Sequence, residues 1–301
     1  MAAADAPPDV SVIVPVFDDA DRLDACLTAL ADQNTRRRFE VVVVDNGSRD
    51  DPAAVTARYP FVRTFLEPSP GSYAARNTGA RHARGAILAF TDADCLPSPS
   101  WIDAGATAVE RLKRSCIIAG GIDLFVPGGD GSHSTRHPVV AYELATAFRQ
   151  REYVEQKHFG PTANLFVARA AFDALGGFDG HLRSGGDKDF GNRAFAAGIP
   201  LVYDDAVRVA HPSRPEVAAL EAKVRRVVGG EHLLARGRHG RLVRDYLRYA
   251  LLRPSNALLQ ILRAPTLAWR EKLAAATIVP RVAAWQLDER RRLVRGAEAP
   301  R

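Results

Sequence analysis

Two aspartates, Asp92 and Asp94, stand two positions apart directly after the apolar run at residues 86–90. On an extended segment this spacing points both carboxylates to the same side. Neighbouring carboxylates repel each other unless a cation joins them, and a hard divalent ion that keeps positions open for phosphate oxygens suits such a pair. The pair therefore predicts a metal site that neutralises a diphosphate. The same pattern also occurs in solvated loops and Asx-turns.

Short apolar runs and helical patterns alternate along the part of the chain that must position these acids. Four runs have the composition of strands, and the second and fourth lack polar alternation, as do parallel strands buried on both faces: residues 10–16, 41–44, 62–66 and 86–90. Between them, Leu23, Leu27 and Leu30 recur at helical spacing, and a second helix is predicted over residues 72–83. The alternation predicts an α/β fold with a doubly wound, mostly parallel sheet.

Ligands of an open parallel sheet bind beyond the carboxyl ends of its strands. Asp45 follows the run VVVV in the same way as Asp92 and Asp94 follow AILAFT. We therefore expect all three carboxylates on one rim of the sheet.

Composition excludes several classes of protein. Of 301 residues, 47% are apolar and 25% charged, which argues against disorder, collagen and coiled coils. The three cysteines lie far apart without a CxxC pair, which disfavours a disulfide scaffold or a zinc site and favours a reducing compartment. The first residues do not have the pattern of a signal peptide, and the longest apolar stretch, residues 273–285, is too short and interrupted to span a membrane. A Gly/Ser/His-rich stretch at residues 127–138 predicts a surface loop.

The charge is distributed unevenly. Residues 1–213 hold 22 basic and 27 acidic residues, a net charge of −5, whereas residues 214–301 hold 19 and 8, a net charge of +11. In the basic part, Arg241, Arg244 and Arg248 alternate with leucines at helical intervals. Such helices can lie on an anionic membrane surface, or they can pack over the sheet with their arginines solvated.

Four segments, in this order, carry a resemblance to a known family: VSVIVPVFD, FEVVVVDNGSRDD, ARNTGARHARGAILAFTDADCLPSPSWI and GGFDGHLRSGGDKDFGNRAFAAG. Through them, residues 10 to about 212 resemble the family 2 glycosyltransferases of GT-A fold. The resemblance implies a nucleotide-binding αβα sandwich that transfers a sugar from a nucleotide sugar, with inversion and with bound Mn²⁺ or Mg²⁺.

Domain boundaries follow from the resemblance and from the charge distribution. We expect a catalytic domain over residues 1–213, with a nucleotide-sugar half at about 10–122 and an acceptor half at about 123–213. Residues 214–301 would form a basic helical extension.

The resemblance assigns a donor side. It implies that Pro15, Phe17 and Asp45 hold the nucleoside, with Phe17 standing where the family commonly has Tyr. Arg76 and Asn77 match the family's ARNxG segment, in which the arginine lies near the diphosphate. A guanidinium fork suits that role.

The metal ligands are also implied by the resemblance. Asp92 and Asp94 match the DxD motif, with Asp94 the firmer ligand, and His211 stands where several members supply a histidine to the metal. Asn46 matches a position that is often Asp and has a secondary role in substrate binding.

The acceptor side rests on the segment SGGDKDF. Inverting transfer needs one carboxylate to take the proton of the acceptor hydroxyl, and the resemblance assigns this role to Asp187. Gly186 occupies the position where the family has Glu, and Asp189 is the second candidate for the base, or a cap of the following helix. Two further residues are expected at the substrate pocket, with core packing as the alternative for the first: Trp101 and Asn164.

The expected partners are a UDP-, GDP- or dTDP-linked sugar and a glycan or lipid-linked acceptor, in the synthesis of cell-surface polysaccharide or glycolipid. The expected location is cytoplasmic, or peripheral on the inner face of the plasma membrane. A nucleotidyltransferase acting on sugar 1-phosphates is one alternative, but it would show a Gly-rich basic loop where this chain has VPVFD. A non-enzymatic polyanion or nucleic-acid binder is another, and the acidic body and the lack of interleaved aromatic residues oppose it.

Overall fold

The computed structural model describes residues 6–112, 115–127, 137–235 and 247–299. The chain forms two compact units. The first unit contains Met1–Asp123, Phe148–Leu182 and Gly186–His211, and the second contains Leu124–Ala147, Arg183–Gly185 and Pro212–Arg301. Most of the loop predicted at residues 127–138, together with Arg241 and Arg244, lies outside the described residues.

The first unit is built on a sheet of eight strands in the order β3-β2-β1-β4-β7-β6-β8-β5. Its strands are β1 (Val10–Val16), β2 (Phe39–Asp45), β3 (Val62–Leu66), β4 (Ile87–Thr91), β5 (Leu96–Pro97), β6 (Ile117–Phe125), β7 (Asn164–Ala168) and β8 (Leu201–Pro212). Its helices are α1 (Ala20–Ala31), α2 (Pro52–Thr56), α3 (Ser72–His82), α4 (Trp101–Arg111), α6 (Gln150–Lys157), α7 (Arg169–Ala174) and α8 (Gly186–Ala196). The four predicted strands and the helix predicted over residues 72–83 are confirmed, with ends that differ by two residues or fewer, and Leu23, Leu27 and Leu30 lie in the helix α1.

The sheet is mixed. β1 runs parallel to β2 and β4, and β2 runs parallel to β3, so this half has the predicted parallel arrangement. Beyond β4 the pairs β4–β7, β6–β7 and β5–β8 are antiparallel. The apolar runs predicted parallel strands correctly in the first half, and the later strands carry no run that would distinguish the two orientations.

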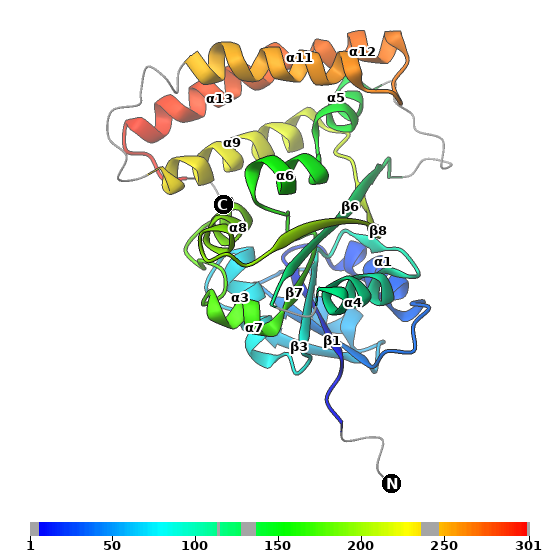
Figure 1. The fold of residues 1–301 in the computed structure, drawn as a ribbon. Helices are drawn as coiled ribbons and strands as arrows, with labels where there is room; N and C mark the ends of the chain where they lie inside the picture. Colours follow the sequence, from blue (N-terminus) through cyan, green and yellow to red (C-terminus); the bar gives the residue numbers. More distant parts are fainter. Residues whose placement is uncertain (1–5, 113–114, 128–136, 236–246, 300–301) are drawn as a thin grey trace. The chain divides into compact units, whose positions relative to one another are not determined.

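Helices cover both faces of the sheet (Figure 1), and alternating side chains of the strands pack against them. Val41 and Val43 of β2 join a core with α1 and α4, whereas Val42 and Val44 pack against α3 on the opposite face. A side chain at Gly79 of α3 would place its Cβ 2.5 Å from a methyl carbon of Ile13. Glycine at this position therefore lets α3 lie close against β1 and β2, on the face of the sheet that α3 covers.

Helices make up the second unit: α5 (Pro138–Thr146), α9 (Val217–Leu234), η1 (Arg248–Leu252), α11 (Arg253–Arg263), α12 (Trp269–Ala276) and α13 (Val279–Val294). Ala141 of α5 packs with Ile261, Leu267 and Ala275 in one apolar cluster. Val139, two positions earlier and therefore on another side of the helix, packs with residues of α9 and α13 in another. Two sides of α5 thus organise this unit. Among the described residues, no helix is long and apolar enough to cross a membrane.

The second unit also buries a charged cluster around Glu143, whose side chain is 1% exposed. Its carboxylate accepts hydrogen bonds from Lys223 Nζ at 2.7 Å and from the backbone N–H of Arg214 at 2.7 Å. Arg214 Nη1 lies 3.2 Å from the same carboxylate. Burial favours the neutral acid, but Lys223 and Arg214 outweigh it, so the pKa of Glu143 lies below its usual value.

Candidate active site

The rim of the sheet that carries Asp45, Asp92 and Asp94, here called the acidic rim, includes the segment that follows β4, which ends at Thr91. The chain turns there, with the N–H of Cys95 donating to the carbonyl of Asp92 at 3.1 Å, and then forms β5. β5 pairs with the end of β8, with Leu96 opposite Ala210. This pairing places His211, the residue after Ala210, beside the two aspartates, although it lies more than a hundred positions further along the chain.

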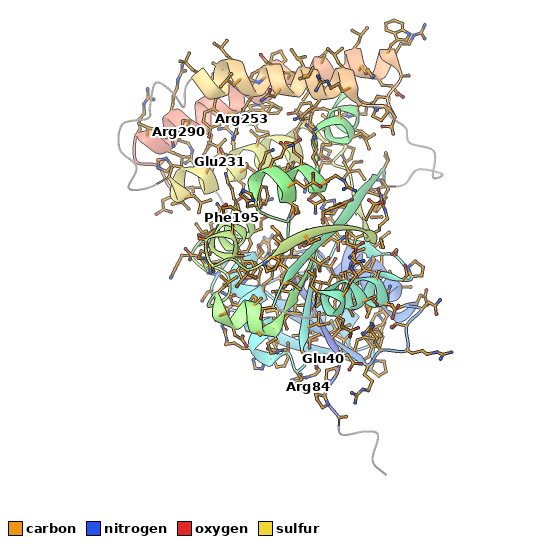
Figure 2. All side chains as sticks on the ribbon, viewed as in Figure 1. Glu40, Arg84, Phe195, Glu231, Arg253 and Arg290 are labelled. Atoms are coloured by element: carbon orange, nitrogen blue, oxygen red, sulfur yellow. The ribbon has the colours of Figure 1, made fainter. Side chains whose placement is uncertain are left out.

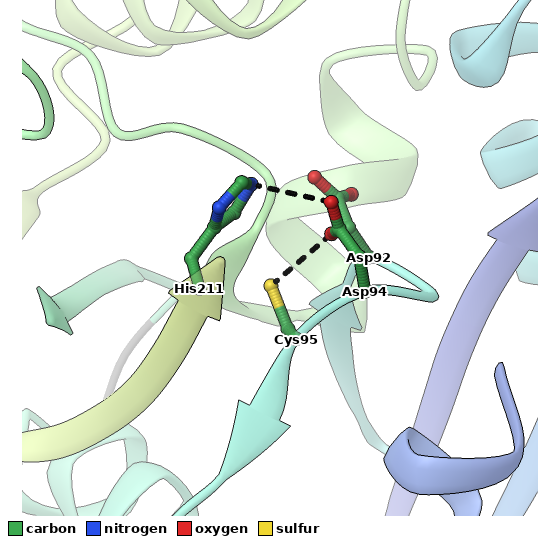
Figure 3. A group of neighbouring side chains, drawn as sticks. All are labelled: Asp92, Asp94, Cys95 and His211. Atoms are coloured by element: carbon green, nitrogen blue, oxygen red, sulfur yellow. Dashed lines mark hydrogen bonds and ion pairs between the residues drawn. The ribbon is translucent and has the colours of Figure 1, made fainter. Parts of the chain in front are cut away.

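Asp92, Asp94, Cys95 and His211 form one cluster, in which a potential ligand atom of each lies within 4.8 Å of the others (Figure 3). His211 Nε2 is 3.6 Å from Asp94 Oδ2, and the imidazole is 3% exposed. The carboxylate oxygens suit Mn²⁺ or Mg²⁺, and the imidazole could add one nitrogen ligand. Burial raises the pKa of the Cys95 thiol well above its usual value, so this sulfur stays protonated and is a poor ligand for such an ion.

Arg76 brings a buried positive charge to the cluster. It lies on α3, 3% exposed, and one of its terminal nitrogens donates to Asp92 Oδ1. Within the described part of the chain, its Nε is buried and has no hydrogen-bond partner. A buried donor without a partner is costly in a folded protein, so an acceptor supplied by a ligand would be stabilised here.

Asp187 lies in the first turn of α8 and is connected to Arg76 through Tyr73. Tyr73 Oη donates to Asp187 Oδ1 at 3.2 Å, and its ring lies 5.5 Å from the Arg76 guanidinium. The N–H of Lys188 donates to the same oxygen at 2.8 Å. Burial raises the pKa of Asp187 above its usual value, although both hydrogen bonds and the charge of Arg76 act in the opposite direction.

Two residues of this site escaped the sequence analysis, Tyr73 and Arg22. Tyr73 precedes Arg76 by three positions on one helix, a spacing that places the two side chains together. Arg22 Nη1 is 3.7 Å from Asp94 Oδ2, while its Nε is 2.6 Å from Asp19. Burial raises the pKa of Asp19, and the nearby Asp94 adds to the effect. The spacing of three positions between Asp19 and Arg22 is the feature of the sequence from which their contact could have been predicted.

The residues expected at the nucleoside stand at the ends of neighbouring strands. Pro15 is buried in β1, opposite Val44, and Phe17 follows β1 with 42% of its surface exposed. Asp45 ends β2 and accepts a hydrogen bond from the N–H of Ser48 at 2.8 Å. Because β2, β1 and β4 are parallel neighbours, Asp45 lies at the same edge of the sheet as Asp92 and Asp94.

Three amides expected at the substrate make hydrogen bonds to the backbone instead. Asn46 donates to the carbonyls of Glu67 and Ser69, both at 2.8 Å, and so holds the segment that leads into α3. Asn77 bonds both backbone groups of Phe178, at 2.7 and 2.9 Å. Asn164 has no exposed surface and donates to the carbonyls of Gly121 and Val207.

Trp101 and Asp189 are likewise held by protein groups. Trp101 is fully buried, and its Nε1 donates to Asn164 Oδ1 at 2.8 Å. Asp189 Oδ2 accepts from Arg193 Nε at 2.7 Å, one helical turn further along α8. Arg193 in turn donates to the carbonyl of Gly177. The structure thus brings together Arg76, Asp92, Asp94 and His211, with Asp187 connected through Tyr73, and places Trp101 and Asn164 in the core.

Comparisons with known proteins identify the class of this fold and site. The model of the family described as Glycosyl transferase family 2 matches residues 11–176. Glycosyltransferase AglE of Haloferax volcanii is 35% identical over 214 residues, which cover 69% of this chain and 68% of AglE. The O-antigen biosynthesis protein RfbC of Myxococcus xanthus is 29% identical over 222 residues, covering 68% of this chain but 17% of RfbC.

A mannosyltransferase of Pyrobaculum calidifontis, PcManGT, solved with GDP-Man and Mn²⁺, has a similar fold. The match has a TM-score of 0.58 at 21% identity and covers 96% of this chain and 88% of that one. The chain belongs to glycosyl transferase family 2, and it is a glycosyltransferase of GT-A fold. This assignment replaces the alternatives of a nucleotidyltransferase and a polyanion-binding protein.

Proposed function

We propose that this enzyme transfers a sugar from a nucleotide-diphosphate sugar to an acceptor hydroxyl with inversion at the anomeric carbon. The observation that carries the proposal is the convergence of Asp92, Asp94, His211 and Arg76 at one edge of the sheet, with Asp187 connected to Arg76 through Tyr73. A guanidinium and a set of possible metal ligands for the leaving diphosphate, and a carboxylate for the acceptor, then belong to one site. In this assignment the first unit is the catalytic one.

Each residue has a separate task in the proposed reaction. Asp92, Asp94 and His211 would hold Mn²⁺ or Mg²⁺, which when bound neutralises the charge of the diphosphate. Arg76 donates to diphosphate oxygens, for which its unpartnered Nε is available. The exposed ring of Phe17 packs against the nucleobase, and Asp45 accepts a hydrogen bond from the nucleoside.

Asp187 takes the proton of the acceptor hydroxyl. Its Oδ1 already accepts hydrogen bonds from Tyr73 and Lys188, so we assign the proton transfer to Oδ2. A raised pKa makes the carboxylate a stronger base, and general bases work best when their pKa approaches the working pH. Asp189 is engaged with Arg193 and is the less suitable base.

The acceptor that we propose is a glycan or a lipid-linked glycan in cell-surface polysaccharide or glycolipid synthesis. The name of the relative RfbC, an O-antigen biosynthesis protein, supports this role. The donor is a UDP-, GDP- or dTDP-linked sugar, and the complex of PcManGT with GDP-Man supports a nucleotide sugar.

Thermal unfolding with UDP-, GDP- and dTDP-sugars, each with and without Mn²⁺, tests the proposal. A ligand at one hundred times its dissociation constant stabilises the folded state by about 2.7 kcal/mol. We expect one nucleotide class to raise the melting temperature by several degrees when Mn²⁺ is present, and much less when it is absent.

Asp94→Asn should abolish the Mn²⁺-dependent part of this shift, because it removes a metal ligand. Asp103→Asn is the matched control, since Asp103 is exposed on α4 and pairs with Arg37. The proposed site is wrong if Asp94→Asn and Asp103→Asn respond to donor and metal alike, or if no nucleotide sugar stabilises the enzyme.

A further inference from the structure

Exposed large apolar side chains are concentrated in one segment of the second unit. Residues 247–273 contain eight of the fourteen such side chains found among the described residues. They are Leu247, Leu251, Leu252, Leu258, Leu259, Leu262, Trp269 and Leu273. Single exposed leucines are ordinary, but a contiguous set marks an interaction surface.

The spacing of these residues places them along one side of η1 and α11. Leu251 and Leu258 are seven positions apart, as are Leu252 and Leu259, and Leu262 follows one turn later. These intervals repeat on one face of a helix. Trp269 and Leu273, four positions apart, lie on one face of α12. We call these seven side chains the outer stripe.

An adjoining side of the same helices is already covered. Ile261 is 1% exposed and packs with Ala264, Leu267 and Ala275 against α5. α11 is therefore apolar on two sides, and its inner side alone accounts for its attachment to the unit. None of the outer-stripe residues belongs to that cluster, so their exposed surface needs another explanation.

The charges beside the outer stripe are almost all positive. Arg263 and Arg270 are exposed and have no ion-pair partner in the part of the chain that the structure describes. Glu271, the one acidic residue of the sequence from 247 to 273, caps α12 by accepting the N–H of Ala268 at 2.7 Å. Arg253 belongs to the interior instead, because it pairs with Glu231 (Figure 2).

We propose that the outer stripe of η1, α11 and α12 docks on the surface of a lipid bilayer that contains anionic lipids. Leucines and a tryptophan on one face, with arginines beside them, are the features of helices that lie in the membrane interface. The Arg270 guanidinium is 5.6 Å from the Trp269 ring, so the aromatic and the cationic anchor lie together. A second copy of this chain fits less well, because two such surfaces would bring like charges face to face.

This surface differs from the one that the arginine pattern predicted. Arg241 and Arg244 lie outside the described residues, and the outer stripe begins after them. The inference does not depend on the proposed transfer reaction, because vesicle binding is measured without a donor or an acceptor.

Co-sedimentation of the full chain with sucrose-loaded vesicles tests the proposal. We compare phosphatidylcholine vesicles with vesicles of equal parts phosphatidylcholine and phosphatidylglycerol. The enzyme should bind the anionic vesicles at least tenfold more tightly, and added salt should weaken this binding. Replacing the charges with Arg263→Gln and Arg270→Gln should cost about fivefold each.

The triple variant Leu258→Gln, Leu259→Gln, Leu262→Gln should lose binding to anionic vesicles while unfolding at an unchanged temperature. A triple control replaces three exposed apolar residues elsewhere with Gln, namely Leu66, Val227 and Val294, and should bind like the wild type. Equal binding by the two triple variants, or no binding by the wild type at low salt, overturns the proposal. A dimer that the Leu variant converts to a monomer, without any lipid binding, would assign the stripe to a second copy.

Discussion

Each unit of this enzyme shields a carboxylate from most of the solvent, and the pKa values of the two carboxylates are shifted in opposite directions. Glu143 in the second unit accepts hydrogen bonds from Lys223 and Arg214, and its pKa is lowered. Asp187 in the first unit has no ion-pair partner among the described residues, and its pKa is raised by burial. The protein itself neutralises the charge of Glu143, whereas it does not neutralise that of Asp187.

The acidic rim continues this contrast. Asp19, Asp92 and Asp94 share two guanidinium groups, those of Arg22 and Arg76, within the described part of the chain. Negative charge is therefore left in excess where the proposed donor and metal bind. A structural cluster satisfies its own charges, but a binding site leaves some of them for the ligand. The excess charge costs stability in the free enzyme, which gives the comparison measurable consequences.

Asp187→Asn should produce the largest effect on catalysis. Asn cannot accept the proton of the acceptor hydroxyl, so the turnover rate should fall by about a thousandfold, within the range found for general bases. Binding of the nucleotide sugar and Mn²⁺ should persist, because the variant leaves Arg76 and the aspartates of the rim unchanged. Turnover and donor affinity are measured separately, by product formation and by calorimetry.

Asp189→Asn is the control for this variant, because Asp189 lies one half-turn away and pairs with Arg193. It should retain most of the transfer activity. If instead Asp189→Asn is inactive and Asp187→Asn is active, the two residues exchange roles and Asp189 is the base.

The same Asp187→Asn variant should be more stable than the wild type at neutral pH. A carboxyl whose pKa is raised in the folded state binds its proton more tightly there, so stability falls as the pH rises from the unfolded-state pKa through the folded-state pKa. Asn escapes this penalty. The gain in melting temperature should disappear in acid, where Asp187 is protonated, and a gain that is independent of pH would contradict the explanation.

Glu143→Gln should have the opposite effect on stability. It removes the buried carboxylate that both Lys223 and Arg214 contact, and breaking a buried pair in this way costs about 3 to 5 kcal/mol in the free energy of unfolding. Urea denaturation measures the loss. Glu110→Gln is the control, because Glu110 is exposed and pairs with Arg37 at 2.6 Å, so its loss should cost less than about 1 kcal/mol.

The effect of pH on the stability that Glu143 contributes is the reverse of the effect at Asp187. Because its pKa is lowered in the folded state, its contribution is present above the unfolded-state value of about 4.3 and is lost as the pH falls through the folded-state pKa. The difference between Glu143→Gln and the wild type should therefore shrink in acid. A difference that grows in acid would show that Glu143 is not the neutralised carboxylate described here.

The sequence predicted the frame of the site better than its details. Uninterrupted apolar runs specify buried parallel strands, so the places where β2 and β4 end, and hence the edge with Asp45, Asp92 and Asp94, followed from pattern alone. The β5–β8 pairing that brings His211 to this edge is a long-range contact with no local signal. The resemblance to the family, and not the pattern, supplied this residue.

Side-chain partners were the part that pattern reading could not supply. Asn46, Asn77 and Asn164 look alike in sequence, and an amide can face a ligand or a backbone group with the same ease. In the structure all three hold backbone segments in place. Glu143 was not singled out either, since Lys223, its partner, is eighty positions away.

Tyr73→Phe should have the smallest effect and sharpens the comparison most. Phe retains the ring beside Arg76 but removes the hydroxyl that donates to Asp187 Oδ1, so one stabilising bond to the charged carboxylate is lost. The pKa of Asp187 should then rise further, moving the acidic limb of the kcat/KM profile to higher pH, with a loss of about tenfold or less at the optimum. Tyr59→Phe is the matched control, because Tyr59 makes a similar bond to Asp24 at 2.6 Å between α1 and the segment after α2. If the Tyr73 hydroxyl contributed to packing alone, both variants would change the free energy of unfolding and neither would shift the pH profile of kcat/KM. A shift in Tyr73→Phe alone would show that Tyr73 positions the base and adjusts the pH range in which it works.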